Sequence, residues 1–247
     1  VSVSIEMTLE DNVVADRSFP FEYVVPPNTV QCIARISRLY KDRDFSIRYS
    51  SSWMVGDFNA RHSPKDGYRL PWQLGEYYQV SQAYGGTITT HTDRSSRYAV
   101  DFGMPVGTPV LAARSGTVVN MEDSFSVGAL DKVLSDKANF VDILHDDGTI
   151  ATYAHLAVRS VAVRLGQRVS VGEKLGLSGS TGYSSGPHLH FSVWRPEKGV
   201  KGFVQVSLPV EFCMDDTAPC APVRYGTTIS SGPTASPLVN GSSAGPD

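Results

Sequence analysis

The sequence has little cysteine. It contains three cysteines in 247 residues, and no two of them have the Cys-x-x-Cys spacing that cysteine-based zinc sites use. Three cysteines are also too few for a framework of several disulfides. Cys213 and Cys220 flank a short loop that a disulfide could close in an oxidising compartment, whereas Cys32, on an alternating pattern, is predicted to be a buried core residue.

Long apolar runs and an excess of charge of one sign are also missing. No run approaches the length of a membrane span, so no transmembrane segment is expected. The formal net charge is only −3, which gives no long-range attraction to nucleic acid or to an anionic membrane. No basic segment followed by an apolar one opens the chain, so no signal peptide is expected in the sequence as given.

Helical periodicity is scarce, and only residues 128–137 have the pattern of a short helix. A parallel α/β sheet, which needs long helices between its strands, is therefore disfavoured. Strand patterns separated by glycine-rich turns dominate instead. Residues 140–145 and 150–155, for example, flank an Asp-Asp-Gly-Thr segment that is typical of a hairpin. The predicted fold class is mainly β, with antiparallel sheets.

The strand patterns fall into two regions. Residues 1–66 hold three alternating segments, including Val30 to Ile36, and predict a small β-sandwich-like domain. A turn-rich boundary leads to residues 73–212, which predict a larger antiparallel β-sheet domain. Residues 227–247 are rich in serine, glycine and proline and are expected to form a flexible tail.

One strand pattern is unusual in carrying two histidines on one face. Side chains alternate between the faces of a strand, so His188 and His190 point the same way. The opposite face is apolar and is expected to lie on the core (Leu189, Phe191 and Val193). The chain has only six histidines, and two imidazoles two residues apart can converge on one metal ion. The alternative is a polar strand face without a ligand.

Three further residues are candidates for the same chemistry. His91 lies in a threonine-rich segment, and His155 ends the second strand of the predicted hairpin. Asp101 stands between Val100 and Phe102, and a carboxylate buried there needs a partner, since an isolated buried charge is very costly. A metal ion is one such partner and a hydrogen-bonded cation is another. A turn cap at the end of a strand is the structural alternative.

Four motifs occur in one order along the chain: Tyr98 to Phe102, Gly107 to Gly116, Tyr153 to Leu156, and Gly179 to Phe191. Together they resemble the lysostaphin/LytM-type zinc metallopeptidases, over about residues 75 to 196. The resemblance implies a β fold of the duplicated-hybrid-motif type and an enzyme that cuts the peptide part of bacterial peptidoglycan. It also implies a location in the periplasm, in the cell envelope or outside the cell.

The resemblance assigns a role to each candidate residue. One Zn²⁺ would be bound by His91, Asp101 and His190, while His188 would be the general base and His155 the other catalytic histidine. Such a ligand set leaves the fourth position of a zinc ion open for water, as catalytic sites do. The division of labour between the two catalytic histidines stays open.

The spacing between the first two ligands departs from the family pattern. The family has aspartate four residues after its first histidine, whereas His91 and Asp101 are ten apart. The inserted loop, Asp93 to Arg97, therefore has to fold outward, and Asp93 is a spare candidate ligand.

A competing motif, Gly182 to Gly186, matches the Gly-x-Ser-x-Gly nucleophile elbow of serine hydrolases. That elbow lies between a strand and a helix, but Pro187 and a strand follow here.

The sequence thus predicts a zinc-dependent metalloendopeptidase that hydrolyses cross-bridge or stem-peptide bonds of peptidoglycan through a zinc-activated water and a histidine base. The alternative is a catalytically silent peptidoglycan-binding module that activates a separate wall hydrolase. The expected partner is the peptidoglycan peptide, with no nucleic acid, and the protein is expected to be a monomer.

Overall fold

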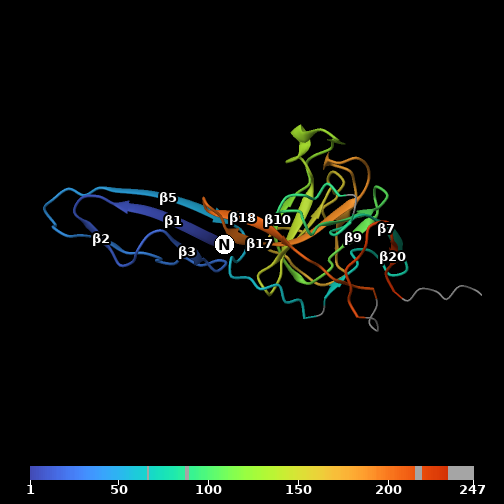
Figure 1. The fold of residues 1–247 in the computed structure, drawn as a ribbon, viewed down its shortest axis with the longest axis horizontal. Helices are drawn as coiled ribbons and strands as arrows, with labels where there is room; N and C mark the ends of the chain where they lie inside the picture. The colour runs from blue at the N-terminus through green and yellow to red at the C-terminus, as the bar shows by residue number, and fades with distance from the viewer. Residues whose placement is uncertain (66, 87–88, 215–218, 233–247) are drawn as a thin grey trace, which may run out of the picture.

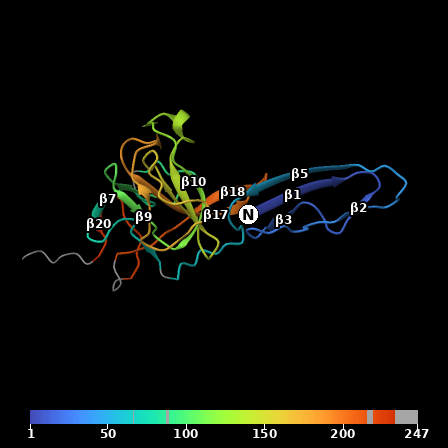
Figure 2. The same ribbon diagram turned by 180° about the vertical axis from the view of Figure 1, so that it is seen from behind.

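The structure is a computed structural model that describes residues 1–65, 67–86, 89–214 and 219–232. Its regular structure is almost all β (Figures 1 and 2). The strands are β1 (Ser2–Leu9), β2 (Val13–Ala15), β3 (Phe21–Val24), β4 (Ile36–Arg38), β5 (Ile47–Met54), β6 (Tyr68–Arg69), β7 (Tyr77–Gln82), β8 (Val100–Gly103), β9 (Pro109–Leu111), β10 (Gly116–Glu122), β11 (Gly128–Ala129), β12 (Phe140–Leu144), β13 (Ile150–Ala154), β14 (Arg168–Val169), β15 (Lys174–Leu177), β16 (Gly182–Tyr183), β17 (Leu189–Lys198), β18 (Phe203–Leu208), β19 (Phe212–Cys213) and β20 (Thr228–Ser230). A single 3₁₀ turn, η1 (Lys132–Leu134), stands where a short helix was expected.

A nine-stranded antiparallel sheet organises the second region, and it confirms the predicted fold class. Its order is β14-β10-β12-β13-β17-β8-β7-β20, with β18 pairing with β17. The predicted hairpin joins β12 to β13, and its turn is closed by the Asp147 carboxylate, which accepts the Thr149 N–H at 3.0 Å. Gly148 supplies the positive φ of 83° that this turn requires. Among the described residues, no helix is long and apolar enough to cross a membrane.

The N-terminal strands form two small separate sheets. Strand β1 lies between β3 and β5, while β2 pairs with β4, and these strands extend away from the large sheet (Figure 1). The side chains of Tyr49 and Trp53 are both 69% exposed, and the main hydrophobic cluster begins only at Tyr68. The expected β-sandwich-like domain is therefore not confirmed. The prediction for Cys32 is wrong: it is exposed, because residues 30–35, around it, form no strand.

The core confirms the two-faced character predicted for the histidine strand. Leu189, Phe191 and Val193 on β17 are fully buried. The Phe191 ring packs against the rings of Tyr153 and Phe212, with centroids 5.1 and 5.4 Å away. This apolar face fixes the strand on the core, so the histidines are held on its opposite, outer face.

Replacement of Phe191 by alanine is expected to lower the free energy of unfolding by about 3–5 kcal/mol, because it opens a cavity between buried rings. Urea unfolding followed by circular dichroism measures this change. Phe45→Ala, at a phenylalanine that is 46% exposed, is the matched control and should cost well under half as much. Equal losses in the two variants would mean that the core does not depend on β17.

The C-terminal part is tied to the large sheet. A disulfide joins Cys213 to Cys220, as the spacing allowed. Strand β20 pairs antiparallel with β7, so the expected tail does not begin at Thr227. Main-chain hydrogen bonds to β7 and the packing of the single apolar side chain of β20, Ile229, against the core hold this strand, which explains why a composition poor in apolar residues was misleading. Residues 233–247 of the expected tail lie outside the described residues.

Candidate metal centre

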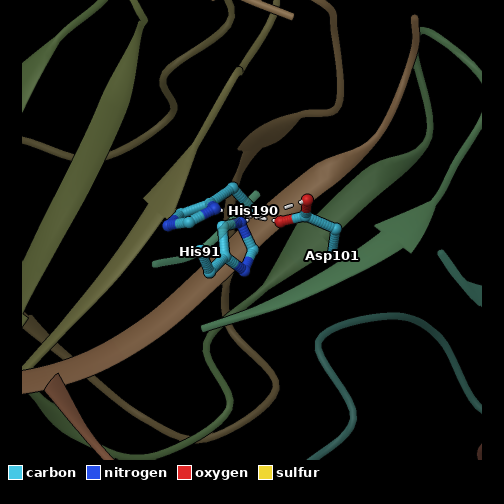
Figure 3. A group of neighbouring side chains, drawn as sticks. All are labelled: His91, Asp101 and His190. Carbon is cyan, nitrogen blue, oxygen red and sulfur yellow. Dashed lines mark hydrogen bonds and ion pairs between the residues drawn. The ribbon is translucent and has the colours of Figure 1, made fainter. Parts of the chain in front are cut away.

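His91, Asp101 and His190 converge from three parts of the chain, with their ligand atoms all within 4.8 Å of one another (Figure 3). Asp101 on β8 is the direct cross-strand partner of His190 on β17, so both side chains leave the sheet on one face. The Asp101 carboxylate lies 2.9 Å from His190 Nδ1 through one oxygen and 3.4 Å from His91 Nε2 through the other. Ligands of a tetrahedral zinc ion lie at comparable separations, roughly 3.4 Å.

The ten-residue spacing between His91 and Asp101 is accommodated by a compact turn. The Asp93 carbonyl accepts the N–H groups of Ser96 and Arg97. Arg94 pairs with Glu197 at the end of β17, which holds the turn against the sheet. Asp93 itself is exposed and lies outside the ligand cluster, so the turn brings His91 to Asp101 without it.

Asp101 is an almost fully buried carboxylate whose ion-pair partners within the described chain are all histidines. Burial alone would raise its pKa, but the His190 and His91 rings outweigh burial and hold the pKa of Asp101 well below its usual range. For His91 burial lowers the pKa, and the Asp101 carboxylate more than reverses this, so that pKa is raised. A buried carboxylate between two imidazoles is a donor set that suits a divalent transition-metal cation, zinc included.

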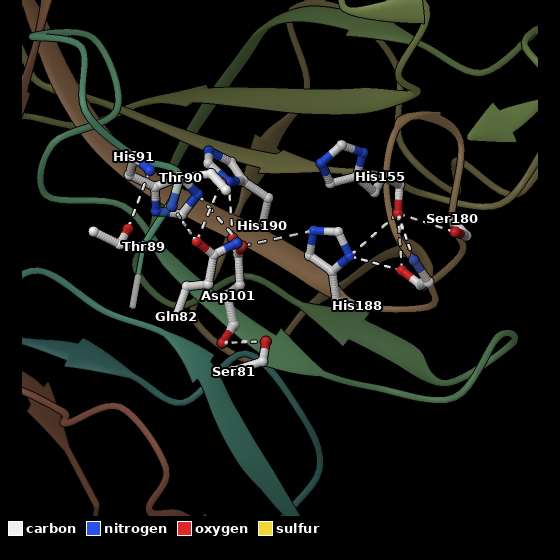
Figure 4. A network of polar contacts seen from close by, with 12 residues as sticks. Ser81, Gln82, Thr89, Thr90, His91, Asp101, His155, Ser180, His188 and His190 are labelled. Carbon is white, nitrogen blue, oxygen red and sulfur yellow. Dashed lines mark hydrogen bonds and ion pairs between the residues drawn. The ribbon is translucent and has the colours of Figure 1, made fainter. Parts of the chain in front are cut away.

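Gln82 is a site residue that the sequence analysis missed. Its amide nitrogen donates to Asp101 Oδ2 at 2.7 Å, and its amide oxygen accepts the Thr90 N–H at 2.6 Å (Figure 4). It therefore links the carboxylate to the loop that carries His91. A register shift after Val80 places Gln82, rather than Ser81, opposite Asp101.

Gln82→Ala is expected to weaken zinc affinity about 10- to 100-fold, because hydrogen-bond partners of metal ligands orient them. Competition with a chromophoric chelator measures the affinity. Gln79→Ala, three residues earlier on β7 and not bonded to Asp101, is the control and should bind zinc as the parent does. An unchanged affinity in Gln82→Ala would remove the bridging role.

His155 and His188 lie beside the ligand cluster, with ring centroids 4.5 Å apart. His188 Nδ1 lies 2.8 Å from the Gly186 carbonyl oxygen, and His155 Nδ1 lies 2.6 Å from that of Thr181. Since a carbonyl only accepts, both rings carry their proton on Nδ1 and leave Nε2 as a free acceptor. The Nε2 of His188 is 3.8 Å from Asp101 Oδ2, which aims it at the candidate metal position.

The position of His155 is conformationally demanding. It follows the last residue of β13 with φ at +64°, a conformation that few non-glycine residues adopt. Burial, together with His188 and His190, lowers the pKa of His155 to about 3, so its ring is neutral near pH 7. This arrangement holds the ring over the site rather than out in solvent.

The competing serine motif does not have the geometry of a nucleophile elbow. Ser184 lies between β16 and β17, two strands, and is only 5% exposed. Its hydroxyl donates to the Gly186 carbonyl at 2.8 Å. A serine that is buried and bonded to the main chain is not presented to a substrate, which argues against serine hydrolysis.

A groove of about 460 Å³ runs from the ligand cluster across the outer face of the sheet. Its lining includes His155, His190, Asp142, Thr152, Ser192 and Trp194. Asp142 is only 7% exposed, and burial raises its pKa to about 6 despite hydrogen bonds from Thr152 and Asn120. The groove thus carries a second buried carboxylate that the sequence analysis did not single out.

Asp142→Asn is expected to stabilise the fold at pH 8 by up to about 3 kcal/mol and to change it little at pH 4. The native pKa lies above that of the unfolded chain, so the native state favours the protonated carboxyl and stability is lost as pH rises from about 4 through 6. Urea unfolding at both pH values measures the difference. Asp136→Asn, whose side chain is 76% exposed, is the control and should show no such trend. A variant less stable than the parent at pH 8 would contradict the assignment.

Comparison with known proteins shows that most of the residues of this site lie in a segment that matches a family model. The family model for peptidase family M23 matches residues 95–202, which include Asp101, His155, His188 and His190 but not His91. An uncharacterized metalloprotease of Buchnera aphidicola subsp. Baizongia pistaciae is 38% identical over 163 residues. The peptidoglycan DD-endopeptidase ShyA of Vibrio cholerae is 35% identical over 113 residues.

These matches span only part of each protein. They cover 62% and 44% of this chain but 40% and 24% of the two relatives, so the chain spans well under half of their length. Among solved structures, the antimicrobial peptidase lysostaphin from Staphylococcus simulans is 31% identical, with a TM-score of 0.40. That match covers 57% of this chain and 51% of lysostaphin.

Proposed function

Residues 95–202 match the model for peptidase family M23, and on that basis we propose that the protein is a zinc-dependent endopeptidase of this family that cuts the peptides of bacterial peptidoglycan. The observation that carries the proposal is the convergence of His91, Asp101 and His190 beside two further histidines with free Nε2 atoms. Three protein ligands with one open position are the pattern of catalytic, rather than structural, zinc sites.

Each residue has a distinct task in this proposal. His91, Asp101 and His190 would hold the ion, and zinc when bound would polarise the scissile carbonyl and bring the pKa of a water molecule to about 7. His188 would take the proton of that water through Nε2 and later return it to the leaving amine. His155, with its proton committed to the Thr181 carbonyl, can accept but not donate, so it would orient the attacking water.

The substrate class rests on the relatives. ShyA is a peptidoglycan DD-endopeptidase, so a cell-wall peptide is the proposed substrate and the cell envelope or exterior the proposed location. Both a cross-bridge and a stem-peptide bond are compatible with the family. The groove beside the ligands has room for an extended peptide.

Hydrolysis of purified peptidoglycan with and without a chelator tests the proposal. We expect soluble peptides to appear, to stop appearing with chelator, and to return when zinc is restored. Release that survives the chelator would contradict the zinc mechanism. A protein that binds zinc and peptidoglycan but releases nothing would support the alternative, a silent module that activates another hydrolase.

A further inference from the structure

A row of polar side chains crosses the floor of the groove, two residues along the strands from His190. Asp142 on β12 pairs with Thr152 on β13, which pairs with Ser192 on β17, so the three side chains share one face of the sheet. His190 lies in the adjacent row, because it pairs with Ala154 and Ala154 with Phe140. The face that presents the metal ligand therefore also presents Asp142.

The distance from Asp142 to His190 follows from sheet geometry. The two residues lie two strands apart across the sheet and two residues apart along it, which is roughly 12 Å between Cα atoms. An extended peptide advances about 3.3–3.6 Å per residue. A substrate whose scissile bond lies at His190 would thus have a group about three to four residues away within reach of Asp142.

The contacts of Asp142 leave its negative charge uncompensated. The Thr152 hydroxyl donates to Oδ1 and in turn accepts the Trp194 indole N–H at 2.9 Å. The other oxygen, Oδ2, has only a long 3.4 Å contact from the Asn120 amide. No ion pair joins Asp142 to another residue of the described chain. Buried carboxylates are ordinarily paired with a cation, so this one has an unfilled partner position.

The raised pKa of Asp142 agrees with a missing cationic partner for its carboxylate. Burial raises the pKa of Asp142 to about 6, so at neutral pH the carboxylate is mostly ionised at a cost to the fold. The groove is open beside it, and a cation that enters from solvent would remove that cost. A peptide substrate brings such a cation if it carries a primary amine.

We propose that Asp142 is a specificity-determining residue that binds an ammonium group of the peptide substrate, about three to four residues from the scissile bond. The inference rests on the proposed function and deepens it by naming the substrate class: peptides with a free α-amine or an amine on a diamino-acid side chain. The ammonium would bond to Oδ2 while Thr152 and Trp194 hold Oδ1 in place.

The test compares cross-linked peptides released from peptidoglycan with the same peptides after acetylation of their primary amines. For the parent protein, kcat/KM is expected to be at least about tenfold higher for the unmodified peptides, the size of a charge-assisted hydrogen bond. In Asp142→Asn this preference should fall to within about twofold. Asp136→Asn removes one negative charge as well, but from an exposed carboxylate, and this variant should keep the full preference for the unmodified peptides. Peptides with an amine only at the N-terminus, or only on a side chain, identify the source.

The outcomes separate this inference from the proposed function. Cleavage of native and acetylated peptides at equal rates by the parent protein would overturn the ammonium site and leave the endopeptidase standing. A preference that persists in Asp142→Asn would equally overturn it. If neither peptide is cleaved, the proposed function fails. Calorimetric binding of the two peptides then decides the inference alone: tighter binding of the native peptide that needs Asp142 supports it, and equal binding overturns it.

Discussion

His188→Ala is expected to lower kcat for peptide hydrolysis by about 10²- to 10⁴-fold while leaving one zinc bound per chain. General-base catalysis contributes an effect of this size, and His188 contacts the ligand cluster without belonging to it. Its Nδ1 proton is committed to the Gly186 carbonyl, so only Nε2 can accept the proton of the attacking water. Steady-state hydrolysis and metal analysis of the same preparation measure both quantities.

A second histidine provides the control for this variant. His62 is also partly buried, and its Nε2 contacts the Tyr68 hydroxyl at 3.2 Å, away from the candidate site. His62→Ala should therefore keep both zinc and activity. If His188→Ala has the same kcat as the parent protein, another group is the general base, and His155 is the first candidate to test.

Asp101→Asn is expected to weaken zinc binding by more than about 100-fold and to abolish hydrolysis at micromolar zinc. The substitution keeps the shape of the side chain but removes the anionic ligand, and loss of a hydrogen-bond partner of a ligand already costs about 10- to 100-fold. The same loss removes the one negative charge among the three ligands, in a site where all three side chains are mostly buried. Chelator competition measures affinity, and thermal unfolding with and without zinc checks that the variant folds.

Asp93→Asn is the matched control, because the two carboxylates are eight residues apart and Asp93 is the alternative ligand that the sequence offers. It is exposed and lies outside the cluster, so its loss should change zinc affinity less than about twofold. A large loss in Asp93→Asn with little in Asp101→Asn would mean that the turn between His91 and Asp101 rearranges on metal binding.

Patterns with a strict period could be predicted from the sequence. The alternation around His188 and His190 predicted an apolar inner face, and burial of Leu189, Phe191 and Val193 confirms it. The hairpin between β12 and β13 could be predicted equally well, because its turn residues are typical of a hairpin turn. Both signals are local, and local signals survive folding when the tertiary structure agrees with them.

The features that the sequence did not reveal depend on contacts between distant segments. Gln82 reaches Asp101 only because a register shift in β7 turns it toward the site, and a glutamine in an alternating strand carries no such signal. The alternation at the N-terminus predicted a sheet with one buried face, but nothing local showed that side chains such as Tyr49 and Trp53 would stay exposed. Asp142 did have a signal in the sequence, because it is a charged residue inside the otherwise apolar segment Phe140–Leu144, but the sequence analysis did not single it out.

The central claim is that His91, Asp101 and His190 hold one zinc ion. Anomalous diffraction at the zinc edge from crystals grown with zinc tests this claim most directly. We predict one strong peak bonded to a nitrogen of each histidine and an oxygen of Asp101, at about 2.0–2.2 Å, with a fourth position facing His155 and His188. Zinc bound elsewhere, or a peak that lacks any one of these three ligands, would contradict the account.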